Sequence, residues 1–186
     1  MTVKLYLESI EAAYAQTFDA QVVAIDGNSI VLDRTLFYPL GGGQQWDTGV
    51  LSGPNGDINV QEVRGRGDVH HTVETEHQLV VGDEVRGTVD WNTRYAHMRM
   101  HTAQHLMSGI AYELFNGVRT VGNQIHAEKS RIDFNPISFD EAMMERLVDV
   151  VNGHINTGLE VSDSVMTREE INTCLLYTSP SPRDAQ

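Results

Sequence analysis

Two histidines four residues apart, His101 and His105 in MHTAQHLMSG, are the side chains of this sequence best suited to chemistry. On an α-helix, four residues advance about 6 Å and turn about 40° past a full turn, so both imidazoles lie on one face. Two imidazoles in this arrangement can bind one metal ion, as in helical zinc motifs. The apolar residues of the same segment project to the opposite side, which argues against core histidines. Two interpretations remain: a solvated helix face, or one wall of a metal site.

The metal interpretation lacks several ligands. No carboxylate lies between the two histidines, as it does in H-E-x-x-H, and Gln104 can orient a water but cannot take its proton. Zinc takes three or four protein ligands. His97 continues the four-residue series, but it lies two turns from His105, too far to join the same ion. The only cysteine, Cys174, lies in an atypical C-terminal segment. We therefore expect an incomplete ligand set.

The second unusual stretch is RTLFYPLGGGQQWDTG, residues 34–49. Three consecutive glycines permit positive φ angles and a close approach of another backbone. Neither the phosphate-loop pattern nor the dinucleotide-binding pattern is present. The stretch is either a tight corner of a barrel or a loop that presents Thr35 and Gln44 to a ligand.

Strand-like segments separated by turns fill the first half of the chain. QVVAI and SIVLD are joined by Asp26-Gly27-Asn28, a hairpin signal, and LSGPNGDINVQEV, RGRGDVHHTVE and VVGDEVRGTVDW continue the pattern. No helical pattern occurs between residues 20 and 90. We expect residues 1–90 to form a small glycine-rich β-barrel.

Helical and strand patterns mix in the second half. Apolar spacing predicts a helix over residues 92–115, ended by Asn116-Gly117, and then a strand pair in RTVGNQIHAE and SRIDF. A helix over residues 138–158 is predicted from a capping box of Ser138 with Glu141 and from the terminator Gly158. Residues 159–167 are predicted to form a strand, followed by a second capping box, Thr167 with Glu170. The expected fold is α+β, with a second domain over residues 91–173.

Composition limits the classes of function. The chain has 186 residues, 40% of them apolar, and a formal net charge of −13. No apolar run approaches the roughly 18 residues of a membrane span, and the N-terminus does not resemble a targeting segment. A single cysteine is typical of a reducing compartment, so we expect a cytoplasmic protein. The acidic balance argues against DNA and against sequence-blind nucleic-acid binding. A local basic patch is predicted from four residues that flank the motifs: Arg94, Arg99, Lys129 and Arg131.

The last residues differ from the rest of the chain. CLLYTSPSPRDAQ, residues 174–186, follows a helix signal directly, and its Ser-Pro-Ser-Pro cannot continue a helix. The stretch resembles translated adapter sequence, so we expect a non-native tail on a protein truncated after about residue 173. A disordered natural C-terminus is the alternative.

Three motifs in a fixed order carry a family resemblance. FYPLGGGQQWDTG, then RYAHMRMHTAQHL, then GNQIHAEKSRIDF resemble the editing region of alanyl-tRNA synthetase. The initial Met and the missing aminoacylation domain resemble the stand-alone AlaX-type alanyl-tRNA editing proteins. The resemblance extends from residue 1 to about residue 173.

The resemblance implies a glycine-rich barrel before a zinc-binding α+β editing domain. Two zinc ligands map onto His101 and His105. The other two, from a later C-x-x-x-H segment, have no counterpart, because Thr178 stands where a histidine would follow Cys174. Two of the four expected ligands are therefore present, and the chain as it stands is expected to bind zinc weakly and to edit poorly. The family's glycine motif maps onto Gly42, Gly43 and Gln44, and its barrel threonine maps onto Thr35.

The implied reaction is ATP-independent hydrolysis of the ester that joins serine or glycine to the terminal ribose of alanine tRNA. A synthetase pocket for alanine rejects these amino acids by only about 1–3 kcal/mol, so a second site must remove them. The backbone N–H groups of Gly42 and Gly43 are candidate oxyanion donors, and Thr35 or Gln44 would satisfy the serine hydroxyl. The candidate pocket residues are Gln104, Asn123, Gln124 and His126; the last three are alternatively ordinary strand-end residues.

Other functions stay open on sequence alone. The chain is alternatively a zinc hydrolase of another ester or amide, or a metal-free, inactive tRNA-binding remnant. It is also alternatively a fragment of a synthetase whose other domains are encoded elsewhere, although the initial Met argues against this.

Overall fold

The computed structural model describes residues 1–74, 76–135, 137–162, 164–167 and 169–170. The chain forms two compact units. The barrel unit contains residues 1–100 and 124–130, and the second unit contains residues 101–123 and the described residues from 131 onward. Helix α2 (Trp91–Leu114) contributes its first part to the barrel unit and the remainder to the second unit.

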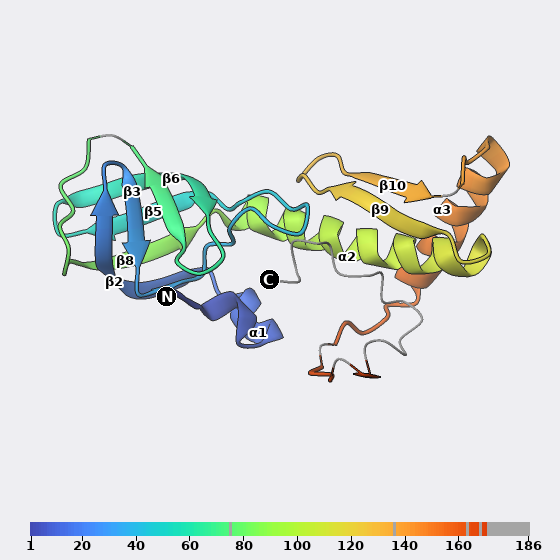
Figure 1. The fold of residues 1–186 in the computed structure, drawn as a ribbon, viewed down its shortest axis with the longest axis horizontal. Helices are drawn as coiled ribbons and strands as arrows, with labels where there is room; N and C mark the ends of the chain where they lie inside the picture. Colours follow the sequence, from blue (N-terminus) through green and yellow to red (C-terminus); the bar gives the residue numbers. More distant parts are fainter. Residues whose placement is uncertain (75, 136, 163, 168, 171–186) are drawn as a thin grey trace. The chain divides into compact units, whose positions relative to one another are not determined.

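The barrel unit is a closed antiparallel β-barrel (Figure 1). Its strands pair in the order β2-β3-β7-β6-β5-β8. Their bounds are β2 Thr17–Asp26, β3 Ser29–Leu32, β5 Gly49–Gly53, β6 Gly56–Arg64, β7 His70–Val73 and β8 Glu84–Val89. The predicted barrel and its hairpins are confirmed.

Alternation along the strands explains the barrel. Phe18, Ala20 and Val22 of β2 are buried, while the residues between them are exposed, which is the period-2 pattern of a strand with one face in the core. Position 87 of β8 has no room for a side chain, because a Cβ there would lie 2.1 Å from the ring of the buried Phe18. The β2–β3 hairpin turns at Gly27, whose φ of +57° suits glycine.

Short elements precede the barrel. β1 (Val3–Lys4) pairs in parallel with β4 (Arg34–Thr35), and a 3-10 turn, η1 (Leu5–Leu7), follows. Helix α1 (Ile10–Ala13) begins after Ser9, whose side chain accepts from the Ala12 N–H at 3.0 Å. β1, η1 and α1 thus lead directly into β2.

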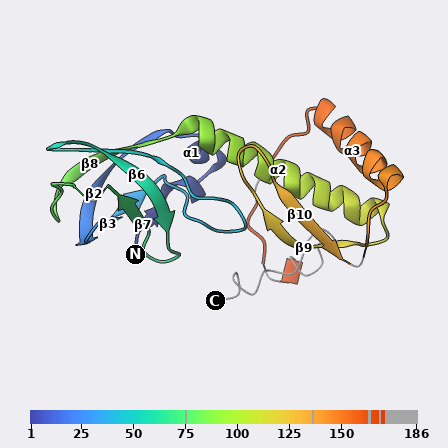
Figure 2. The ribbon, with the colours of Figure 1, turned by 90° about the horizontal axis from the view of Figure 1, so that it is seen from above.

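The second unit combines helices and a strand pair. Strands β9 (Arg119–Gln124) and β10 (Arg131–Asn135) pair, and helix α3 (Glu141–Asn156) follows. Both the strand pair and α3 lie alongside the second part of α2 in Figure 2. They share one apolar core, whose fully buried members are Ile110, Ala111, Val118, Leu147 and Val151. The predicted α+β fold is confirmed, as is the end of α2 before Asn116 and Gly117, both with positive φ.

Two predictions in this unit are wrong. Helix α3 is capped by Asp140, whose carboxylate accepts from the Met143 N–H at 2.8 Å, and not by a box of Ser138 with Glu141. Phe139 packs in the apolar core, so the chain stays non-helical through it. Residues 159–162 and 164–167 form no strand, and Leu159, Val161 and Val165 are exposed, since no neighbouring strand in the described part of the chain pairs with them.

Two further sequence predictions at the C-terminal end are confirmed, and others concern residues that the structure does not describe. The Thr167–Glu170 capping box is confirmed, with the Thr167 N–H donating to the Glu170 carboxylate at 2.7 Å and the Glu170 N–H donating back to the Thr167 hydroxyl at 3.3 Å. Gly158 follows α3 with a φ of +67°, as a terminator should. Cys174 and the rest of residues 171–186 lie outside the described residues. Among the described residues, no helix is long and apolar enough to cross a membrane.

Candidate functional site

The triple glycine forms a tight turn in the barrel unit, which we call the glycine turn (Gly41–Gln44). The Gln44 N–H donates to the Gly41 carbonyl at 2.9 Å, and the Gly41 N–H donates to the Gln44 carbonyl at 3.2 Å. Gly42 and Gly43 at its tip have φ angles of +59° and +83°, a pair that resembles the type I′ turn. Neither of their N–H groups donates a hydrogen bond within the described chain. The turn thus carries two adjacent amide donors that are not used by the fold.

The glycine turn lies against a distant segment of the sequence. The Ile125 N–H donates to the Gly43 carbonyl at 2.8 Å, and the Gln45 N–H donates to the Ile125 carbonyl at 3.2 Å. Ile125 is fully buried and His126 beside it is exposed. The structure therefore brings together the glycine motif and the GNQIHAE motif, two of the three stretches that carried the resemblance.

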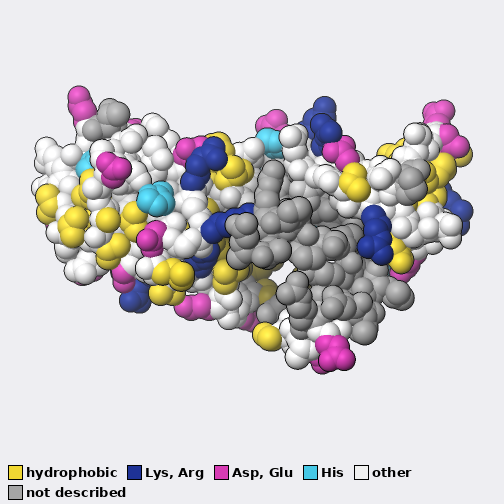
Figure 3. Space-filling view, in the orientation of Figure 1, with side chains coloured by type: hydrophobic (Ala, Val, Ile, Leu, Met, Phe, Trp, Pro, Cys, Tyr) yellow, Lys and Arg dark blue, Asp and Glu magenta, His cyan; other side chains and the backbone are white. Residues whose placement is uncertain are grey.

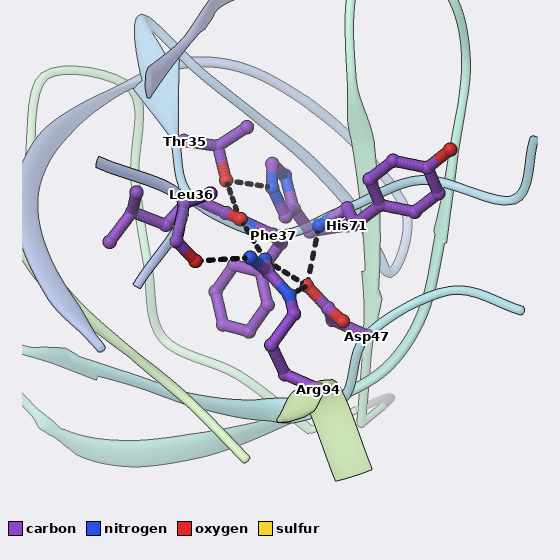
Figure 4. A network of polar contacts seen from close by, with 8 residues as sticks. Thr35, Leu36, Phe37, Asp47, His71 and Arg94 are labelled. Carbon is purple, nitrogen blue, oxygen red and sulfur yellow. Dashed lines mark hydrogen bonds and ion pairs between the residues drawn. The ribbon is translucent and has the colours of Figure 1, made fainter. Parts of the chain in front are cut away.

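A buried ion pair holds the other end of the same loop (Figure 4). The Arg94 Nε–H of helix α2 donates to Asp47 Oδ2 at 2.8 Å, and the two side chains are 3% and 0% exposed. Asp47 Oδ2 also accepts from the Tyr38 N–H at 2.6 Å, and the Arg94 Nη2–H group donates to the Leu36 carbonyl. One guanidinium therefore binds both the start and the end of the loop.

Thr35 lies inside the barrel, hydrogen-bonded to His71. Both residues are fully buried. His71 Nδ1 lies 3.0 Å from the Ile30 carbonyl, which can only accept, so the ring proton is on Nδ1 and Nε2 accepts from the Thr35 hydroxyl at 2.9 Å. The same hydroxyl accepts from the Phe37 N–H at 3.0 Å. The Thr35 hydroxyl proton is thus used in the hydrogen bond to His71 and is not presented to a ligand.

The paired histidines lie in the second unit with their rings stacked. The ring centroids of His101 and His105 are 5.0 Å apart, with 12° between the planes. Burial, reinforced by the charge of His105, lowers the pKa of His101 to about 4, and partial burial lowers the pKa of His105. Both imidazoles are therefore neutral at pH 7, which is the state that binds a metal. As a donor pair they fit zinc.

Further ligands do not join this pair within the described residues. There, no group of three or more His, Cys, Asp or Glu side chains is arranged to hold a metal ion. The pair therefore fits half of a four-ligand site.

Gln104 is the most buried of the predicted pocket residues, at 5% exposed. Its Nε2 donates to the Ser108 hydroxyl oxygen at 3.1 Å, which also accepts from the Thr120 hydroxyl of β9 at 2.7 Å. Its Oε1 is buried and has no hydrogen-bond partner among the described residues. This side chain is fixed by its nitrogen and leaves an acceptor available. Asn123, also in the second unit, is half-buried in β9, and Gln124 at the end of β9 is exposed.

The predicted basic patch is wrong in one member and weakened in another. Arg94 is buried and its charge is paired with Asp47. Its guanidinium donates to the Asp47 carboxylate and to the Leu36 carbonyl, two acceptors that the loop turns inward. Arg131 pairs with Asp133 at 2.8 Å, whereas Lys129 is exposed and the exposed Arg99 lies over the Tyr95 ring. On the face in Figure 3, lysine and arginine side chains occur in small groups among acidic ones.

Sequence reasoning missed the roles of three buried side chains of the barrel unit: Asp47 and Arg94, which hold the loop that carries the glycine turn, and His71, which binds Thr35. It also missed the burial of His97. Asp47 has the sequence signature of an ordinary loop carboxylate. Arg94 and His97 lie three residues apart on one helix face, and a helix face that carries both apolar and polar residues does not by itself reveal which polar ones are buried.

Comparison with known proteins adds a consistent set of relatives. Residues 3–93 match the family model for class II (A) tRNA synthetases. An alanyl-tRNA editing protein AlaX-M of Saccharolobus solfataricus is 39% identical over 173 residues, which cover 91% of this chain and 71% of the relative. The AlaX-M protein of Pyrococcus horikoshii is 36% identical, covering 87% of this chain and 73% of the relative. An alanine–tRNA ligase of Sulfurisphaera tokodaii is 33% identical, covering 91% of this chain but 19% of the ligase.

Proposed function

This chain belongs to the AlaX-type alanyl-tRNA editing proteins, and from that membership we propose that it hydrolyses mischarged alanine tRNA in trans. The substrate is the ester between serine or glycine and the terminal ribose. The observation that carries the proposal is the glycine turn: two adjacent amide donors outside any hydrogen bond of the described chain, on a loop held by a buried ion pair.

The reaction needs a place for negative charge. Water attacks the ester carbonyl carbon, the carbonyl oxygen becomes an oxyanion, and the bond to the ribose oxygen then breaks as that oxygen takes a proton. The N–H groups of Gly42 and Gly43 are suited to donate to this oxyanion, because a preorganised pair of backbone donors needs no rearrangement as charge develops. The products are the free amino acid and an uncharged tRNA 3′ end.

His101 and His105 would hold zinc through their neutral imidazoles, together with ligands beyond those described. Zinc bound there would supply a Lewis acid or a fixed point for the 3′ end of the tRNA. The stacked rings support this assignment.

Selectivity for serine needs an acceptor or donor for its hydroxyl. We assign this role to Gln104 Oε1, a buried acceptor, in preference to Thr35, whose proton is committed to His71. A seryl ester would give that acceptor a hydrogen-bond donor, which contributes about 0.5–1.5 kcal/mol, whereas an alanyl ester would leave it unpaired. Thr35 then serves the site by holding the Phe37 N–H at the start of the loop. Gln44, Asn123, Gln124 and His126 remain proposed pocket residues.

Deacylation assays test the proposal. Seryl-, glycyl- and alanyl-tRNA(Ala) are incubated with the chain, and release of amino acid is followed with and without added zinc. We expect seryl or glycyl ester to be hydrolysed faster than alanyl ester. Loss of bound zinc in His101→Ala with His105→Ala, but not in the exposed control His154→Ala, supports the metal assignment.

Two outcomes favour the alternatives. Hydrolysis of small esters without hydrolysis of aminoacyl-tRNA would indicate a different hydrolase. Binding of tRNA without hydrolysis of any ester, in a zinc-loaded preparation, would indicate a binding module.

A further inference from the structure

His97 is a buried histidine that the proposed reaction does not use. It lies on the first part of α2 and is 4% exposed. Its Nδ1 has no hydrogen-bond partner among the described residues, and the same holds for Oδ1 of Asp47, which is 1% exposed. Two buried polar atoms of the barrel unit thus lack hydrogen-bond partners within the part of the chain that the structure describes.

Such atoms are costly. A buried donor or acceptor without a partner destabilises a fold, and an apolar residue of similar shape avoids that cost. Most buried polar groups in native proteins bind protein or ordered water. The presence of His97 at a position that leucine would fill therefore points to a role that leucine could not serve.

The position of His97 indicates that role. Arg94 lies three residues before His97 on the same face of α2, and its Nε–H donates to Asp47 at 2.8 Å. The charges of Asp47, His126 and Arg94 act on the His97 ring. Asp47 and Arg94 hold the loop that carries the glycine turn, and His126 follows Ile125, which binds the turn itself. His97 is therefore close to both attachments of the glycine turn. Burial lowers its pKa, so the ring is neutral at pH 7.

We propose that His97 is a positioning residue for the glycine turn, and that its Nδ1 and Asp47 Oδ1 bind one buried water molecule between them. The water would donate to the carboxylate oxygen and complete the hydrogen bonding of the imidazole nitrogen. The function of this water-mediated link rests on the proposed deacylase activity. The link fixes Asp47, and Asp47 in turn holds the loop whose Gly42 and Gly43 amides would donate to the oxyanion.

Three substitutions separate this role from simple packing. His97→Leu removes both ring nitrogens. His97→Asn keeps a polar atom near the place of Nδ1, and His97→Gln keeps one near the place of Nε2. His77→Leu is the matched control, because His77 Nδ1 is also buried and unpartnered within the described chain, while its Nε2 binds the distant Gly27 carbonyl.

The primary measurement is amide hydrogen exchange in the full chain. The N–H groups of Gln44, Asp47 and Ile125 report the glycine turn and its two attachments, and the Val89 N–H, bonded to the Gln16 carbonyl, reports the barrel. We expect exchange at the three reporters to rise about tenfold or more in His97→Leu and His97→Gln, with the Val89 rate unchanged. His97→Asn and His77→Leu should leave the three reporters near wild type.

Deacylation gives the functional measurement. A displaced turn should lower kcat by about 10- to 100-fold in His97→Leu, with KM for the aminoacyl-tRNA within about twofold. Unchanged exchange in His97→Leu, uniform acceleration over the whole barrel, or rescue by Gln in place of Asn would each overturn the inference. If exchange responds as expected but the wild-type chain hydrolyses no aminoacyl-tRNA, the proposed function fails and the positioning role stands.

Discussion

At the residue scale, His71 shows how the barrel uses a histidine as a neutral hydrogen-bonding group. Its Nδ1–H donates to the Ile30 carbonyl and its Nε2 accepts from Thr35. A second proton on the ring would meet the Thr35 hydroxyl, which already donates there. Burial, the main cause, lowers the pKa of His71 from 6.5 to about 4.

The pKa of His71 predicts a pH dependence of stability. Between pH 6.5 and pH 4 the unfolded chain binds a proton that the folded chain does not, so the unfolding free energy should fall as the pH falls through this window. At about 1.4 kcal/mol for each pKa unit, the full effect is on the order of 3 kcal/mol. Urea unfolding at pH 7.0, 5.5 and 4.5 measures it.

Carboxylates also titrate near the lower end of this window, so a His71→Gln variant supplies the comparison. Its unfolding free energy should change less between pH 7.0 and 4.5 than that of the wild type. Equal pH dependence in the two proteins would show that His71 does not lose its proton on folding.

The glycine turn gives a second prediction at this scale. Gly43 has a φ of +83°, where a Cβ costs about 1–2 kcal/mol. Gly43→Ala should therefore lower the unfolding free energy by that amount, or shift the turn and lower deacylation at unchanged stability. Thermal unfolding and single-turnover deacylation together detect either result.

Gly67→Ala is the matched control for this substitution. Gly67 has no positive φ, and an added Cβ would have open space. That variant should be neutral or slightly more stable, because alanine restricts the unfolded chain more than glycine does. If Gly43→Ala behaves like Gly67→Ala in both measurements, the turn does not require its left-handed backbone.

At the scale of elements, one ion pair joins helix α2 to the loop before β5. Arg94 and Asp47 are both buried, and between them they bind the backbone at Leu36 and Tyr38. Breaking such a pair by removing one partner leaves an uncompensated buried charge. Arg94→Leu should lower the unfolding free energy by about 3–5 kcal/mol, measured by denaturant unfolding.

An exposed pair and a double variant make this prediction specific. Arg131→Leu, which breaks an exposed pair with Asp133, should change the unfolding free energy little, because solvent screens that pair. Arg94→Leu with Asp47→Leu should cost less than the sum of the two single substitutions, since neither charge is then left alone. Additive losses in the double variant would mean that the two side chains act independently.

At the scale of the whole molecule, net charge governs how tRNA is bound. The chain carries a formal net charge of −13 at pH 7, and the positive charge of Arg94 is buried in an ion pair with Asp47. Binding of an alanine-tRNA acceptor stem should therefore involve few phosphate contacts, about two to four, and its affinity should depend only weakly on salt. Titrations between 50 and 300 mM salt measure the slope. A slope as steep as that of a basic, groove-binding protein would reveal a positive surface that the isolated charges do not suggest.

Local pattern was sufficient for most of the secondary structure. Period-2 alternation and Gly-containing turns predicted the barrel strands, and 3.6-residue spacing predicted α2, because these signals depend on neighbouring residues only. The prediction of a strand over residues 159–167 was wrong because it, too, used neighbouring residues only. Alternation makes a strand possible, but a strand forms only where another strand pairs with it. The start of α3 moved by two residues because Phe139 belongs to a core that distant residues complete.

By itself the sequence determined the barrel, the α+β second unit, the glycine turn and the family, since each is encoded in contiguous motifs. Only the tertiary structure decided the partners of the polar side chains. It paired the hydroxyl of Thr35 with His71, buried the charge of Arg94 against Asp47, and brought Ile125 to Gly43 across more than eighty residues of sequence. Whether a polar group faces solvent, substrate or another buried group depends on contacts between residues far apart in the chain, and such contacts leave no local pattern.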